Sequence, residues 1–140
     1  MAKTAVAEAD LFKWVFQKVV PAWWSDATSL YVGLHSADPS GEAVQSVFEV
    51  DYEGYGRVPV VRSAAGWSVA DSVVTNVPDV VFPQCLSGSV TATHVSLGTQ
   101  PLTPGESSRL LFVGVLSSVL PISAGESPRF PAGTLVLYDE

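Results

Sequence analysis

Few side chains in this sequence have the chemistry of a nucleophile or of a catalytic base. The chain contains two histidines, His35 and His94, and one cysteine, Cys85. A nucleophilic triad needs a serine or cysteine beside a histidine that an acid orients, and no serine here lies in a Gly-x-Ser-x-Gly elbow. Both histidines occur in strand-like runs, and Cys85 follows an apolar stretch that favours a buried, inert thiol. We therefore expect no catalytic residue and no enzymatic activity.

The residues that could hold a metal or a cofactor are equally sparse. One cysteine and two separated histidines cannot supply a structural zinc site by local spacing. Glu49, Asp51 and Glu53 alternate, which on a strand would place them on one face, but the oxygen pattern of a calcium loop is absent. We interpret them as solvated charge at a sheet edge, which discourages aggregation. Residues 54–56 lack the third glycine of a dinucleotide fingerprint. We expect no metal and no cofactor.

The composition indicates one domain with a partner surface. The 140 residues are 47% hydrophobic and 15% charged, and the charged share is well below the usual quarter. A chain of this length buries a core without a disulfide or a metal, and its low charge leaves apolar side chains for the surface. The single cysteine excludes an internal disulfide and fits folding in a reducing cytoplasm. No signal peptide is recognisable, and no apolar run is long enough to cross a membrane.

The charge is unevenly distributed along the chain. All three lysines lie in the first twenty residues with two acids, so this stretch carries +1, whereas the rest has four arginines against twelve acids and carries −8. An acidic body without a basic stripe repels phosphate backbones. Nucleic acid is therefore not an expected partner.

The first secondary-structure element that the sequence predicts is a helix. Apolar residues at three- and four-residue spacing predict a helix over residues 5–20 that ends at Pro21. We expect Phe12 and Phe16 to pack on the core. Three tryptophans, Trp14, Trp23 and Trp24, cluster near the end of this helix. The tryptophans could complete the core. The paired Trp23 and Trp24 would point to different sides on a strand or loop, so we expect at least one of this pair to contact a neighbouring subunit.

From residue 28 the pattern changes to short β-rich runs separated by turn residues. The expected strands are 29–35, 56–62, 67–70, 73–75, 79–82, 90–98, 110–116, 119–122 and 133–138. Many short strands at turn spacing, without helical crossovers, predict an antiparallel β-sandwich or jelly-roll-like domain. The chain is thus expected to be mainly β, with a helical segment over 1–24 and the β domain over 25–140.

A short internal repeat connects two expected strand ends. Residues 101–110 and 121–130 are identical at Pro, Gly, Glu, Ser and Arg. The offset of twenty residues leaves room for one strand down and one back, which predicts that both Gly-Glu-Ser loops lie at the same end of the sheet. A simpler interpretation is that strand ends reuse favourable turn chemistry. On the first interpretation, Arg109 and Arg129 would meet acids of a neighbouring subunit.

Short motifs follow one another along nearly the whole chain in a characteristic order. The motifs are Leu30–Pro39, Glu49-Val50, Tyr55–Val60, Trp67, Asn76, Phe82-Pro83, Val90–Val95, Leu110–Leu116 and Phe130–Leu135. This ordered set resembles a family of small virion proteins of tailed phages, which are often labelled tail fibre or minor structural proteins. The resemblance covers nearly the whole chain. It implies a structural component of the virion, present in many copies and without catalysis.

Three roles are compatible with this resemblance. We expect a capsid decoration or cement protein, bound outside the head as a homo-oligomer such as a trimer that contacts the major capsid protein. The first alternative is a short tail-fibre or baseplate component that contacts tail proteins, since the chain has no long fibrous repeat or coiled coil. The second is a carbohydrate-binding module whose aromatic residues stack on host sugars. The aromatic candidates are Tyr31, Tyr52, Tyr55 and Trp67.

Overall fold

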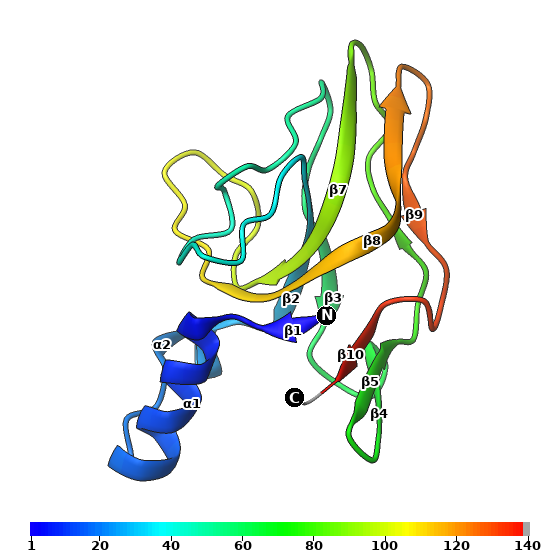
Figure 1. Cartoon of the computed structure of the whole chain (residues 1–140). Helices are drawn as coiled ribbons and strands as arrows, with labels where there is room; N and C mark the ends of the chain where they lie inside the picture. Colours follow the sequence, from blue (N-terminus) through cyan, green and yellow to red (C-terminus); the bar gives the residue numbers. More distant parts are fainter. Residues whose placement is uncertain (139–140) are drawn as a thin grey trace.

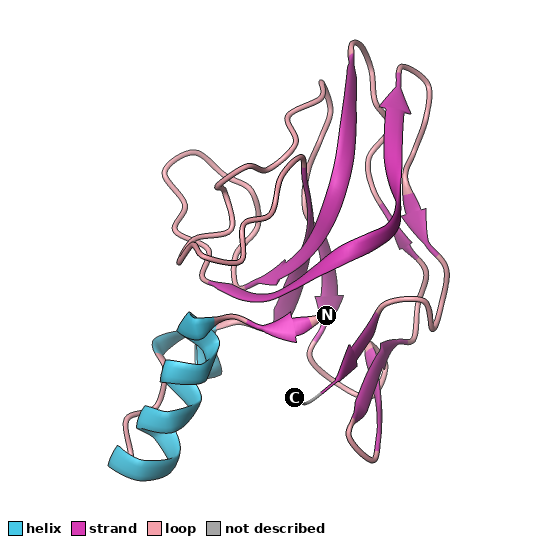
Figure 2. Cartoon of the chain, in the orientation of Figure 1, coloured by secondary structure: helices cyan, strands magenta, loops and turns pink. Residues whose placement is uncertain are grey.

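The computed structural model describes residues 1–138, which form antiparallel sheets and an N-terminal helical segment (Figures 1 and 2). The helices are α1 (Ala5–Gln17) and α2 (Ala22–Asp26); the strands are β1 (Ala2–Lys3), β2 (Ser29–His35), β3 (Val58–Val61), β4 (Trp67–Ala70), β5 (Val73–Asn76), β6 (Val80–Val81), β7 (Ser89–Gly98), β8 (Leu110–Ser123), β9 (Arg129–Phe130) and β10 (Val136–Tyr138). The prediction of a mainly β, antiparallel domain behind an N-terminal helix is confirmed.

The largest sheet has the strand order β1-β8-β7-β2-β3, and two smaller sheets, β10-β5-β4 and β6-β9, accompany it. In β2, Leu30, Val32 and Leu34 alternate with residues that point to the opposite face. The side chains on the face of Leu30, Val32 and Leu34 pack together with side chains of the smaller sheets and form one core, in a sandwich-like arrangement. The buried core residues include Val32, Leu34, Val60, Trp67, Val80, Phe82, Cys85, Ala92, Val95, Leu97, Ile122, Leu135 and Leu137.

Strand β8 differs from the two strands expected over 110–116 and 119–122. It runs as one strand from Leu110 to Ser123 and bends where its register against β7 shifts between Ala92 and His94. The Gly-Glu-Ser loops therefore lie at opposite ends of β8 (Figure 1), and the prediction that they share one end is wrong. A β-bulge absorbs extra residues without ending the strand, so the Ser117-Ser118 pair does not mark a turn.

The two repeated loops do share one turn. In the first, the N–H of Glu106 donates to the carbonyl of Thr103 at 3.1 Å; in the second, the N–H of Glu126 donates to the carbonyl of Ser123 at 3.1 Å. Gly105 has a φ of 75° and Gly125 a φ of 92°, values that an L side chain rarely adopts. The repeat is therefore one turn sequence used twice, as the simpler interpretation predicted.

The helical segment is shorter and more exposed than expected. Helix α1 ends at Gln17, because Lys18 adopts a left-handed conformation, and the chain then forms the additional helix α2, on which Trp23 and Trp24 lie. Helix α1 buries no residue: Phe12 is 56% and Phe16 is 79% exposed, so the prediction that both pack on the core is wrong. The opposite side of α1 is the one that α2 covers, with the rings of Trp14 and Trp24 4.4 Å apart.

Candidate functional site

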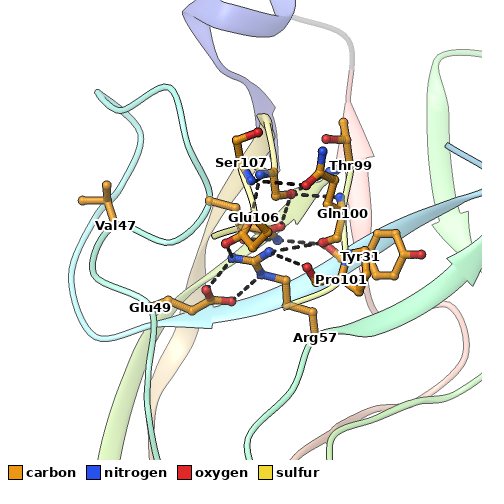
Figure 3. A network of polar contacts seen from close by, with 12 residues as sticks. Tyr31, Val47, Glu49, Arg57, Thr99, Gln100, Pro101, Glu106 and Ser107 are labelled. Atoms are coloured by element: carbon orange, nitrogen blue, oxygen red, sulfur yellow. Dashed lines mark hydrogen bonds and ion pairs between the residues drawn. The ribbon is translucent and has the colours of Figure 1, made fainter. Parts of the chain in front are cut away.

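The densest cluster of polar side chains is buried and surrounds Arg57 (Figure 3). Its guanidinium donates to both carboxylate oxygens of Glu49, at 2.8 and 2.7 Å, and to Glu106 at 2.8 Å. It also reaches the carbonyls of Gln100 and Pro101, at 3.2 and 3.4 Å. Burial would lower the pKa of Arg57, but its hydrogen bonds to the two carboxylates outweigh this and raise the pKa, so the charge is retained.

A second group of hydrogen bonds continues from this cluster across β2 and β7. The buried amide of Gln45 donates to the carbonyl of Tyr31 at 2.9 Å and to the hydroxyl of Ser96 at 3.0 Å, and it accepts from the hydroxyl of Ser108 at 2.8 Å. The ring of His35 contacts Ser96 Oγ through Nε2 at 2.7 Å and the carbonyl of Val47 through Nδ1 at 3.0 Å. The second contact requires the Nδ1–H tautomer.

These contacts attach two long loops, 36–57 and 99–109, to the outer face of β2 and β7. Figure 3 shows Glu49 and Glu106 approaching Arg57 from these two loops, whereas the ring of Tyr31 points away from the cluster. The interpretation of Glu49 as solvated edge charge is wrong, because its side chain is 5% exposed and paired with Arg57. Since the polar groups of this cluster bind one another, the arrangement holds loops in place and presents no open chemical site.

Two groups of this cluster predict that stability falls in acid in two steps. Burial lowers the pKa of His35 from 6.5, so the contribution of the neutral ring is fully present above about pH 6.5 and is lost as the pH falls below it. Burial would raise the pKa of Glu106, but hydrogen bonds from Arg57 and from the Ser108 N–H outweigh that effect and lower the pKa from 4.5. Its contribution is present above about pH 4.5 and is lost as the pH falls through the folded-state value. Urea unfolding across this range should show both phases, with slopes of at most about 1.4 kcal/mol per pH unit for each proton.

The variant His35→Asn separates the two phases. Asparagine keeps a donor for the Val47 carbonyl but does not titrate. The phase that begins near pH 6.5 should disappear, and the phase near pH 4.5 should remain. A variant that kept both phases would assign the first phase to another group.

A group of exposed apolar side chains lies on α1 and just beyond its C-terminal end. We call Phe12, Val15 and Phe16 of α1, together with Val19 after the helix, the docking face; these residues are 56%, 61%, 79% and 50% exposed. The rings of Phe12 and Phe16 lie 6.3 Å apart on the same side of the helix. Figure 1 shows that α1 points away from the sheets, so the fold itself leaves this face uncovered. A contiguous apolar patch of this kind marks an interaction surface.

The base of the helical segment is attached firmly to the β domain. The carboxylate of Asp10 accepts from Arg109 at 2.6 and 2.8 Å and from Trp23 Nε1 at 3.0 Å. Burial would raise the pKa of Asp10, but these hydrogen bonds outweigh that effect and lower the pKa. Arg62 donates to the carbonyls of Trp24 and Ala27 at 2.7 and 2.6 Å and lies over both indole rings of α2. The docking face is therefore carried on a helix with a defined orientation.

A comparison with protein-family models matches residues 2–138 to the family described as "Gp80: Podophage GP4 fiber I protein gp80". The chain belongs to this gp80 fibre protein family. A comparison with curated protein sequences found no match. The family confirms the resemblance to tailed-phage virion proteins and makes the chain a phage structural protein of the fibre type, with the virion as its location.

The predicted interface residues of this gp80 family member lie in three places. Trp24 of α2 packs against both Trp14 of α1 and Trp23, and Trp14 and Trp24 remain 37% and 40% exposed. Arg109 binds Asp10 within the chain, and Arg129 pairs with Asp79 at 3.0 Å on the surface. The structure does not bring Arg109 and Arg129 together, because β8 separates them. Their part in a contact between subunits stays a prediction.

The four aromatic candidates for sugar binding lie in different environments. Tyr52 and Trp67 are 5% and 9% exposed and belong to the core, so neither is a stacking surface. Tyr55 donates to Glu49 at 2.6 Å. Tyr31 lines an open cleft of about 410 Å³ together with Trp23. Within residues 1–138 no helix has the length and apolarity needed to cross a membrane, and no group of three potential ligands could hold a metal ion.

Sequence reasoning did not identify the cluster around Arg57, and it assigned Phe12 and Phe16 of the docking face to the core. The signal that could have revealed the cluster was Arg57, a lone arginine inside a run of strand-forming residues. A charged residue in such a run is better explained by a buried ion pair than by exposure to solvent. The signal for the docking face was the same apolar periodicity that predicted the helix. Periodicity identifies an apolar side but not what covers it.

Proposed function

We propose that this gp80 family member is a non-catalytic component of the podophage tail fibre, attached to a neighbouring virion subunit through the docking face. The observation that carries the proposal is the exposure of three large apolar side chains on a helix that the β domain holds in place, and of Val19 just after that helix. Interfaces are enriched in aromatic residues at their buried centre, and Phe12 and Phe16 would supply that centre. The description of the family as a fibre protein favours the fibre over the capsid shell.

Decoration of the capsid, which the sequence favoured, is the competing placement. It would use the same docking face but a different partner, the major capsid protein. A cryo-electron microscopy reconstruction of the intact particle separates the two. Density for the β domain along the tail supports the proposal, and density at regular positions over the head contradicts it.

Substitution of the docking face should prevent incorporation into particles without unfolding the protein. We expect the double variant Phe12→Gln/Phe16→Gln to reduce the copy number in purified particles by about tenfold or more, since anchor residues of an interface each contribute at least that factor. Quantitative mass spectrometry against the major capsid protein measures the copy number. The thermal midpoint, compared at concentrations where both proteins are monomeric, should stay unchanged, because both side chains are exposed in the monomer.

A matched control changes exposed apolar residues elsewhere. Val69 and Leu86 are 70% and 62% exposed and lie outside the helical segment. The variant Val69→Gln/Leu86→Gln should enter particles at the normal copy number. Normal incorporation of Phe12→Gln/Phe16→Gln would exclude attachment through the docking face.

A further inference from the structure

Helix α1 carries exposed side chains at the spacing of a coiled-coil seam. The seam residues are Ala5, Ala9, Phe12 and Phe16. They follow one another at intervals of four, three and four residues, which is the alternation of heptad positions d and a. All four are exposed, whereas Val6, Ala7 and Asp10, on the side that faces the protein, are partly buried. The seam is therefore available in the monomer over the length of the helix.

Two charged residues border this seam in a complementary pattern. In the same heptad frame Glu8 occupies position g and Lys13 position e. In parallel coiled coils, a residue at g forms an ion pair with the residue at e of the next heptad on the partner helix. These two positions are five residues apart in sequence, as Glu8 and Lys13 are. Both side chains are exposed, and within the described part of the chain neither forms an ion pair. An antiparallel pair would instead place Glu8 opposite Glu8 and Lys13 opposite Lys13.

We propose that the occupant of the seam is a second copy of this chain, with α1 helices associating in parallel around a rotation axis. The inference rests on the proposed function and names the neighbouring subunit that the docking face contacts. A closed cyclic arrangement buries the seam of every copy equally. Because α1 points away from the sheets (Figure 1), parallel association gathers the β domains at one end of the helices.

The fold compensates for the shortness of the helix. With 13 residues, α1 is too short to associate well as an isolated peptide. Here Thr4 caps it by accepting from the N–H of Ala7 at 3.2 Å, and the pair of Asp10 and Arg109 fixes it to the residue just before β8. A helix that is already formed and oriented loses less conformational entropy when it associates.

Charge reversal tests the parallel arrangement on the purified full chain. The single variants Glu8→Lys and Lys13→Glu each place like charges across the seam. In sedimentation velocity over a concentration series, each should raise the dissociation constant of self-association by about tenfold, because symmetry repeats the contact between residues 8 and 13 at every pair of neighbouring helices. The double variant Glu8→Lys/Lys13→Glu restores opposite charges and should recover the wild-type value. Unchanged association in both single variants would overturn the parallel arrangement.

A cysteine at the seam tests the geometry independently of affinity. In a Cys85→Ser background, Ala9→Cys should form a disulfide between copies on mild oxidation, because residues at position a face each other in a parallel seam. Ser25→Cys, on the exposed surface of α2, is the matched control and should not cross-link. The absence of a cross-link, together with a monomeric wild-type protein, would overturn the inference. If that monomer still needed Phe12 and Phe16 to enter particles, the proposed function would stand and the partner would be another virion protein.

Discussion

Replacing Arg57 by methionine is expected to lower the free energy of unfolding by about 3–5 kcal/mol, the cost of leaving buried charges without their partner. Methionine fills a similar volume but donates no hydrogen bond. The side chains of Glu49 and Glu106, each 5% exposed, would then face each other without a cation. Urea denaturation followed by circular dichroism measures the change, with an unchanged m-value as the sign that unfolding stays cooperative.

Two further variants test the reason for this loss. Arg129→Met removes an ion pair with Asp79 whose side chains are 56% and 46% exposed, and it should cost at most about 1 kcal/mol. Arg57→Met combined with Glu49→Gln and Glu106→Gln removes the charges together and should recover part of the loss. If Arg57→Met cost no more than Arg129→Met, the cluster would not hold the loops in the way we describe.

Replacing Phe82 by alanine is expected to cost a similar amount, about 3–5 kcal/mol. The side chain is 1% exposed and lies between the rings of Tyr55 and Phe130, with centroid distances of 6.2 Å to each. Its removal opens a cavity in the core and withdraws support from Tyr55, whose hydroxyl binds Glu49. Urea denaturation again provides the measurement.

The size of the substituted side chain should determine the effect at this position. Phe82→Leu retains most of the volume and should cost less than half as much as Phe82→Ala. Phe48→Ala, at a phenylalanine that is 51% exposed, should change stability by about 0.5 kcal/mol or less. Equal losses for the leucine and alanine variants would show that the ring contacts, and not the cavity, dominate.

Uninterrupted strands bounded by turn residues were predictable from the sequence, and those with irregularities were not. The bounds of β2 and β4 agree with the expected 29–35 and 67–70 because each is a short run of strand-forming residues next to turn residues. Strand β8 was expected as the two strands 110–116 and 119–122, and its continuation through residues 117–118 depends on the irregular pairing with β7, which no local pattern specifies. Helix α2 has five residues, fewer than a periodic signal requires.

The candidate site was less predictable because it depends on long-range contacts. The pairing of Arg57 with Glu106 joins residues 49 positions apart, and no local pattern specifies it. Periodicity correctly predicted an apolar side on α1, but Phe12 and Phe16 were assigned to the core because that is where most such sides are buried. The exposure of that side followed only from the position of α2, which covers the opposite side with its tryptophans.

The way the helical segment joins the large sheet determines how the protein would carry tension. Strand β1 leads into α1 and pairs with β8, and α2 leads back into β2, which lies between β3 and β7. A pull on the helices along the direction of β2 loads both of its hydrogen-bonded ladders in shear, so that their bonds must break together and not one after another. The two-residue strand β1 would yield first, while β2 kept the helices tethered to the folded domain. A phage anchored by such subunits could be pulled by its host contact without its fibre proteins unravelling.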